Sequence, residues 1–171
     1  WSMQSQYHNL PTINGFMQEA GTEYAATDVS YNSDESSVRF SMNMARCYPK
    51  TASVDNWQRI YEFKRNRELS ITDSYRLREI KGITSWNFIT CLKPQITSNG
   101  YINLLSNGKY RTDRKLILKF PNQEFSVKIE EIVMAPADGY QWESSLYRII
   151  FIPNLVYFTS RYRFSIMAEG E

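Results

Sequence analysis

Short segments in which apolar and polar residues alternate run along almost the whole chain, and Asn, Ser, Gly or Pro interrupts them. This period of two is typical of strands with one buried face, and no long stretch has apolar residues at helical spacing. The pattern therefore predicts an all-β fold, an antiparallel β-sandwich of stacked sheets. One short helical turn is expected at 45–48, before Pro49. The expected strands cover 22–31, 37–44, 57–63, 69–78, 83–92, 101–105, 115–120, 125–132, 146–152 and 157–167.

The strands at 57–63 and 69–78 have a pattern that fixes their register as a hairpin folded about Asn66. Side chains on one face must pair across the strands, and a slip by one residue would invert both faces. Arg59 and Asp73, the two charges that interrupt the apolar faces, then meet. We predict a partly buried ion pair between them, of a kind that is more often structural than catalytic. The other expected pairs are Phe63 with Leu69, Tyr61 with Ile71, and Trp57 with Tyr75.

A second hairpin is predicted about the turn Pro121–Glu124, with the apolar faces of 115–120 and 125–132 opposed. Its expected pairs are Leu116 with Ile129, Leu118 with Val127, and Phe120 with Phe125. Residues 85–92 are apolar on both faces near their end, which is typical of a central strand covered by a second layer. The last strand alternates apolar residues with Arg161, Arg163 and Ser165, so one of its faces is expected to be exposed to solvent.

The chain has 171 residues, enough for one domain with a substantial core, and we expect a single domain over 1–171. An aromatic content of 15% agrees with an aromatic-rich β core, and no apolar run reaches the length of a membrane span. The formal net charge of +2 gives little support for a nucleic-acid partner, which requires a strongly basic face. Cys47 and Cys91 lack metal-ligand spacing; they could form a disulfide in an exported protein or remain two core thiols.

The sequence contains no GxSxG, HExxH or P-loop motif. His8 is the single histidine, and alone it could simply bond the backbone of a turn. Its neighbourhood of Asn9, Pro11 and the Asn14–Gly15 turn is polar and rigid, which is typical of loops that place side chains in a cleft. A site that shares His8 with residues outside this chain is physically reasonable. Because structured-looking sequence begins at once, we expect Trp1 to be a domain boundary within a longer protein.

Basic side chains gather in two places and could bind an anionic polymer, although solvated strand ends explain them equally well. They are Lys109, Arg111, Arg114 and Lys115, and the turn residues Lys64, Arg65 and Arg67.

Several short motifs in the first half of the chain resemble the C-terminal β region of heparinase II/III-like polysaccharide lyases. The longest is the run Tyr7–Gly15. The others are Gln18, Ala20–Gly21, Tyr24–Ala25, Ala45, Tyr48–Pro49, Trp57–Arg59 and Leu69–Asp73.

The resemblance implies the later part of an enzyme with an N-terminal (α/α) toroid followed by stacked sheets. The implied reaction is β-elimination on an acidic, uronic-acid-containing polysaccharide, such as heparin or heparan sulfate. It requires neutralisation of the C5 carboxylate, a base for the C5 proton and an acid for the departing O4. In this family a Tyr and a His do that work, and they would lie upstream of Trp1. We therefore expect an inactive fragment that supports the cleft, within an exported, periplasmic or cell-surface lyase.

The resemblance also implies a role for His8 as one ligand of a structural zinc site that some members of the family have. The remaining ligands would be upstream, so we expect weak or no zinc binding by this chain alone. Asn9 is the candidate for substrate contact. The partners implied are the polysaccharide and the protein's own toroid domain.

Two alternatives remain open from the sequence. One is an independent carbohydrate-binding module, which needs an exposed aromatic platform. Its candidates are Trp86, Trp142 and Tyr140, although the pattern favours core use of these rings. The other is a structural domain that forms a homodimer through an exposed sheet edge.

Overall fold

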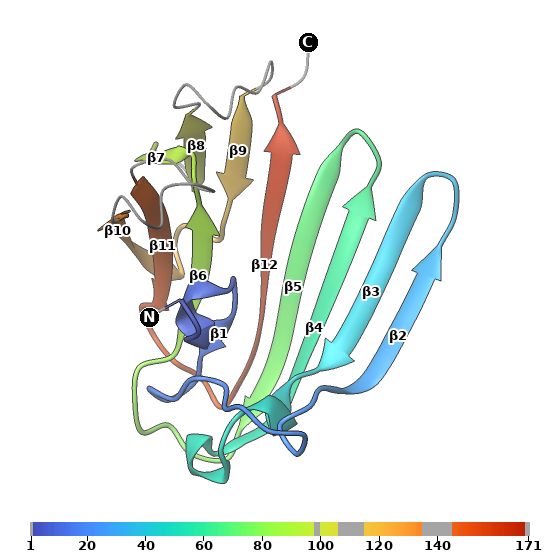
Figure 1. Cartoon of the computed structure of the whole chain (residues 1–171), viewed down its shortest axis with the longest axis vertical. Helices are drawn as coiled ribbons and strands as arrows, with labels where there is room; N and C mark the ends of the chain where they lie inside the picture. Colours follow the sequence, from blue (N-terminus) through green and yellow to red (C-terminus); the bar gives the residue numbers. More distant parts are fainter. Residues whose placement is uncertain (1, 98–99, 106–114, 135–144, 170–171) are drawn as a thin grey trace.

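The computed structural model describes residues 2–97, 100–105, 115–134 and 145–169. Within these ranges the protein consists of strands and three short 3-10 helices, without any α-helix. The strands form two antiparallel sheets that enclose one core, so the predicted β-sandwich is confirmed (Figure 1). The expected turn before Pro49 is the 3-10 helix Ala45–Cys47. No helix in the described part is long and apolar enough to span a membrane.

The larger sheet has eight strands and the smaller sheet has four. The order in the larger sheet is β2 (Thr27–Ser33), β3 (Ser37–Asn43), β4 (Val54–Lys64), β5 (Glu68–Leu77), β12 (Thr159–Ala168), β9 (Leu116–Lys119), β8 (Tyr101–Leu105) and β7 (Lys93–Ile96). The order in the smaller sheet is β1 (Pro11–Thr12), β6 (Ser85–Thr90), β11 (Ser145–Pro153) and β10 (Phe125–Val133). The alternation along the sequence did not indicate the short strands β1 and β7.

The register predicted for the first hairpin is confirmed in β4 and β5. Arg59 pairs with Asp73, and the apolar pairs on either side follow the predicted order. Asn66 lies in the turn with a φ of 58°, a left-handed conformation that asparagine tolerates better than most residues.

The second predicted hairpin is wrong. β9 pairs with β8 and β12 in the larger sheet, whereas β10 pairs with β11 in the smaller one. The turn Pro121–Glu124 therefore carries the chain from one sheet to the other. Leu118 and Phe125 both reach the core, but from opposite layers. An alternating pattern only requires a buried face, and in a sandwich the opposite sheet can cover it as well as a hairpin partner.

Aromatic side chains from both sheets fill the core. Trp86 from β6 is fully buried and packs edge-on against Phe125 and Tyr162, with ring centroids 5.4 and 5.2 Å apart. The expectation of a covered central strand is confirmed, since β6 lies between β1 and β11 and its first four residues are buried. Trp86 therefore cannot serve as an exposed platform. Trp142 and Tyr140 lie outside the described residues.

The smaller sheet covers only part of the larger one. Figure 1 shows β2 to β5 spreading away from β6, β10 and β11. On the core-facing side of these strands, Tyr31, Phe40 and Tyr61 form a cross-strand row that leads to the buried Ile71. The Phe40 and Tyr61 rings stack with centroids 6.4 Å apart, and Tyr31 at the outer end is 66% exposed. The core thus continues outward as an uncovered aromatic surface, which we call the aromatic row.

No disulfide joins Cys47 and Cys91. Cys47 is buried, and desolvation raises the pKa of its thiol above the ordinary value.

Candidate functional site

A pocket of about 270 Å³ opens where the smaller sheet ends over the larger one. Its polar lining residues are His8, Asn9, Tyr61 and Thr90. Apolar side chains from both sheets form the rest of its wall: Leu69, Ile71, Phe88, Ile89, Leu104, Leu118, Ile149 and Ile166. Since Tyr61 belongs to the pocket and to the aromatic row, the two features are continuous. A mostly apolar hollow with a few convergent polar groups is typical of small-molecule binding sites.

The rim of the pocket is held in place by Asn9. This residue has a φ of 59°, and its side-chain oxygen accepts a hydrogen bond from the backbone N–H of Ile89 at 2.6 Å. The preceding 3-10 helix, Ser5–Tyr7, ends at His8. His8 is exposed, and its Nε2 lies within hydrogen-bond distance of the Ser2 carbonyl oxygen. The left-handed backbone of Asn9 and its side-chain hydrogen bond to Ile89 together fix the orientation of the neighbouring His8.

Arg59 connects this rim to the core. Its Nη1 donates to the Asn9 carbonyl oxygen at 2.8 Å and lies 3.5 Å from the Tyr61 hydroxyl. On its other side the guanidinium forms a bidentate pair with Asp73, with Nε–Oδ1 at 2.7 Å and Nη2–Oδ2 at 2.6 Å. The indole Nε1 of Trp86 donates to Asp73 Oδ2 at 2.6 Å. A continuous chain of hydrogen bonds therefore runs from the centre of the sandwich to the pocket rim.

The ion pair lies in the protein interior, with exposed fractions of 1% for the Arg59 side chain and 0% for that of Asp73. Burial by itself would lower the pKa of Arg59, but the charge and hydrogen bonds of Asp73 outweigh it and raise that pKa above its ordinary value. Arg59 thus stays protonated and keeps its donors. Such a fixed cation is suited to positioning the carbonyl of Asn9 and the hydroxyl of Tyr61.

Three further hydrogen bonds anchor the N-terminal segment. The Tyr48 hydroxyl donates to the Pro11 carbonyl oxygen, and burial raises the pKa of Tyr48 above its ordinary value. The buried Asn14 donates from Nδ2 to the carbonyl oxygens of Ala52 and Glu79, at 2.8 and 2.9 Å. Pro11 and Asn14 are thereby fixed to the chain segments just before β4 and just after β5, at the open end of the hairpin.

Four of the residues singled out from the sequence lie close together in the structure. His8 and Asn9 line the pocket, and the ion pair of Arg59 and Asp73 supports Asn9 from behind. Tyr61 was foreseen only as an apolar-face residue of the hairpin. Its place two residues after Arg59, on the same strand face, is the sequence signal that could have assigned it to the site.

The basic clusters lie away from this pocket or outside the described residues. Lys64, Arg65 and Arg67 are exposed at the β4–β5 turn. Lys115 pairs with Glu169, with Nζ–Oε1 at 3.3 Å. Lys109, Arg111 and Arg114 fall outside the described residues.

The described residues do not fit a complete zinc site. Nowhere in that part of the chain do three or more His, Cys, Asp or Glu side chains come together, and His8 alone supplies one imidazole. Tetrahedral zinc needs three or four protein ligands, so any such site would need side chains from elsewhere.

No protein-family model matches the sequence, and no curated protein sequence matches it either. Solved structures do match. The crystal structure of heparan sulfate lyase HepC from Pedobacter heparinus aligns with 100% of this chain at a TM-score of 0.73 and 14% sequence identity. A heparinase III structure aligns with 99% of the chain at a TM-score of 0.70 and 15% identity.

At these identities the matches establish the fold. The chain has the fold of a β-sandwich region found in heparan sulfate lyases. It spans about a quarter of the length of the solved chains, 25% in both cases.

Proposed function

We propose that this chain is the β-sandwich domain of a heparinase II/III-like polysaccharide lyase and that it supports the substrate cleft without catalysing the reaction itself. The observation that carries the proposal is the structural match of almost the whole of this chain to a quarter of a heparan sulfate lyase and to a quarter of a heparinase III. The sequence motifs between Tyr7 and Asp73 also support it, because four of their residues meet at the pocket: His8 and Asn9 line it, and Arg59 and Asp73 form the ion pair behind it.

The proposed reaction is β-elimination on a uronic-acid-containing polysaccharide. The base that removes the C5 proton and the acid that protonates the departing O4 would belong to the protein's own toroid domain. This chain would contribute a rigid wall. Asn9 and the aromatic row lie at one opening of the sandwich, where sugar rings and the second domain could both be accommodated. Because the substrate is a large extracellular polymer, we place the whole protein in the periplasm or at the cell surface.

The decisive experiment expresses the complete reading frame that contains this chain and assays it on heparan sulfate, on an unsulfated polyuronate and on a neutral glucan. β-Elimination leaves a C4–C5 double bond conjugated to the uronate carboxylate, so its product absorbs ultraviolet light, whereas hydrolysis gives no such product. We expect absorbing product from an acidic polymer with the complete protein and none with the isolated chain. Saturated products, or full activity of the isolated chain, would contradict the proposal.

A second candidate function, an independent carbohydrate-binding module, is favoured by two exposed rings: Tyr31 of the aromatic row and Phe63 on the same face of the sheet. Tyr31 and Phe63 are 66% and 42% exposed on the uncovered side of the sheet, and exposed rings of this kind can stack on sugars. If the chain acts as a module, Tyr31→Ala will weaken binding of neutral and acidic oligosaccharides alike. Val133→Ala, at an exposed apolar position on β10 in the other sheet, is the control and should leave binding unchanged. If Tyr31→Ala has no effect on binding, this second candidate is excluded.

A further inference from the structure

The outward face of the eight-stranded sheet carries arginine, hydroxyl and amide side chains where β4, β5 and β12 lie next to one another. Alternate residues of neighbouring strands point to the same side, so the register defines cross-strand rows on this face. The rows are Asn56–Arg76–Thr159, Gln58–Ser74–Arg161 and Ile60–Thr72–Arg163.

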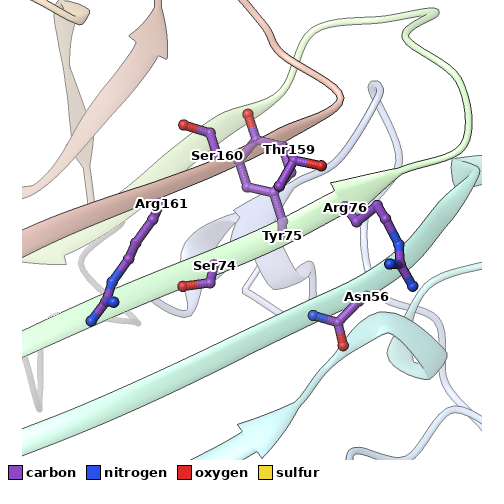
Figure 2. A pocket seen from close by; sticks show the side chains of 7 residues that line it. All are labelled: Asn56, Ser74, Tyr75, Arg76, Thr159, Ser160 and Arg161. Carbon is purple, nitrogen blue, oxygen red and sulfur yellow. The ribbon is translucent and has the colours of Figure 1, made fainter.

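An open groove of about 510 Å³ runs over the first two rows. Figure 2 shows Arg161 and Arg76 at opposite ends of the group, with Ser74 between them on β5 and Asn56 near Arg76 on β4. Arg163 lies two residues beyond Arg161 on the same strand, about 7 Å away along the backbone. We call this arrangement the arginine groove; it faces away from the core and from the pocket of His8.

The cations of the arginine groove are incompletely neutralised. Arg161 is exposed and has no ion-pair or side-chain hydrogen-bond partner among the described residues. Arg76 pairs with Asp55, but the same carboxylate also binds Arg78, so one carboxylate serves two guanidinium groups. Arg163 contacts Glu68 with Nη2–Oε1 at 3.0 Å and remains 49% exposed. Guanidinium donors are therefore left available to an external anion.

The other lining groups favour a sugar chain among the possible anionic ligands. Ser74, Thr159 and Asn56 offer hydroxyl and amide groups that both donate and accept hydrogen bonds, as sugar hydroxyls require. The one aromatic residue that lines the groove is Tyr75, which is buried, so this part of the surface offers no ring on which a nucleic-acid base could stack. Guanidinium groups bind sulfate and carboxylate in a bidentate manner.

We propose that the arginine groove is a second binding site for an anionic polysaccharide, in which Arg161 and Arg163 hold successive sulfate or carboxylate groups and Ser74, Thr159 and Asn56 contact sugar hydroxyls. The site lies on the opposite side of the sheet from the pocket rim, so it would retain the polymer without contacting the reacting bond. The choice of a polysaccharide over other polyanions rests on the function proposed above.

The test measures binding of a sulfated heparan oligosaccharide to the purified chain by titration calorimetry, at low and at physiological salt. We expect Arg161→Ala and Arg163→Ala to weaken binding roughly tenfold when combined, and added salt to weaken binding by the parent chain more than by the double variant. Arg161→Lys should retain part of the affinity, because it keeps the charge but loses the planar fork. Lys128→Ala is the matched control, because Lys128 is an exposed cation on β10 in the other sheet. Circular dichroism on each variant verifies that the fold is intact.

The outcomes separate the groove from the proposed function. Equal binding by the parent and the double variant, or an equal loss with Lys128→Ala, overturns the arginine groove whatever the complete protein catalyses. Arginine-dependent binding that is as tight for polyphosphate or a polyglutamate peptide as for the oligosaccharide overturns the choice of a polysaccharide. Arginine-dependent, sugar-selective binding supports the site even if the complete protein lacks lyase activity, in which case only the proposed function fails.

Discussion

Arg59 and Asp73 face each other across β4 and β5 as a bidentate ion pair that is almost completely buried. Both partners form further hydrogen bonds: Asp73 also accepts one from the Trp86 indole, and Arg59 also donates one to the carbonyl oxygen of Asn9. Its structural effect is to connect both sheets with the N-terminal loop. Because neither charge reaches solvent, the geometry supports a positioning role for the pair.

Replacing one partner of this pair should be far more costly than replacing an exposed charge. We expect Asp73→Asn to lower the free energy of unfolding by about 3–5 kcal/mol, because it leaves the guanidinium of Arg59 buried without a counter-charge. The measurement is chemical denaturation followed by tryptophan fluorescence. Glu62→Gln is the control, since its pair with Arg39 is exposed and 3.5 Å long, and it should have little effect. Similar losses in both variants would contradict the structural importance of the buried pair.

The two predicted hairpins show what alternation along a sequence can and cannot determine. In the first, Arg59 and Asp73 broke the apolar faces at matching positions, so one register alone satisfied both charges. In the second, Leu118 and Phe125 supplied only apolar faces, which any apolar layer could cover. Charges within strands therefore carried more topological information than the hydrophobic residues around them.

The residues of the candidate pocket could be foreseen only in part. His8 and Asn9 attracted attention because polar turn residues preceded the first strand, and the structure places both at a pocket. The arginine groove could not be assigned from the sequence. Arg76 and Arg161 are 85 positions apart (161 − 76), and they become neighbours only because β12 returns to pair with β5. From the sequence, Arg161 and Arg163 were predicted only to lie on the solvent-exposed face of a strand.

The close approach of Gly82 to Asn14 gives a second prediction about stability. A Cβ atom at Gly82 would lie 2.3 Å from the backbone oxygen of Asn14. Asn14 is buried, and its side-chain amide is held by hydrogen bonds, so this residue cannot easily move. We expect Gly82→Ala to destabilise the protein by about 3 kcal/mol, because backbone atoms must move. At Gly15 an added Cβ meets nothing within 4 Å, and only the φ of +84° opposes it, so Gly15→Ala should cost about 1 kcal/mol. Thermal denaturation measures the stability of both variants. A larger loss for Gly15→Ala than for Gly82→Ala would contradict the close packing of Gly82 against Asn14.

The turn between β2 and β3 should give a measurable dependence of stability on pH. Hydrogen bonds from the side chain and backbone of Ser36, and then from Ser37, lower the pKa of Asp34 from 3.8 to about 2. Because the pKa is lowered in the folded protein, the ionised Asp34 carboxylate stabilises the fold above pH 3.8. This stabilisation is lost as the pH falls through about 2. Asp34→Asn should therefore reduce the fall in melting temperature over this window. Carboxyl titration by NMR that places Asp34 near 3.8 would refute the proposed cause.

Metal dependence distinguishes a role of His8 within this chain from a role in a larger protein. With a single imidazole and no grouped ligands in the described part, we expect the isolated chain to bind zinc weakly or not at all, and a chelator to leave its melting temperature unchanged. In the complete protein we expect chelation to lower stability, and His8→Ala to remove that sensitivity. If the complete protein proves insensitive to chelators, the assignment of His8 as a zinc ligand is wrong.

Asn9 links the stability of the pocket rim to the proposed function. It combines a left-handed backbone with a side-chain acceptor for the Ile89 N–H, and three substitutions separate these features. Asn9→Asp keeps both and should be nearly neutral, Asn9→Gly keeps only the backbone conformation, and Asn9→Ala keeps neither. We expect Asn9→Ala to lower the free energy of unfolding by about 2 kcal/mol and Asn9→Gly to lower it by roughly half as much. Chemical denaturation measures both values.

In the complete protein, the lyase rate should follow the same order, because Asn9 also receives the hydrogen bond from Arg59 and sets the position of His8. The comparison is made below the melting temperature of every variant, so that unfolding does not lower the rate. A rate that falls with Asn9→Asp as strongly as with Asn9→Ala would mean that the amide itself contacts substrate, as its place on the pocket wall permits. Unchanged rates in all three variants would show that the rim does not contribute to the cleft.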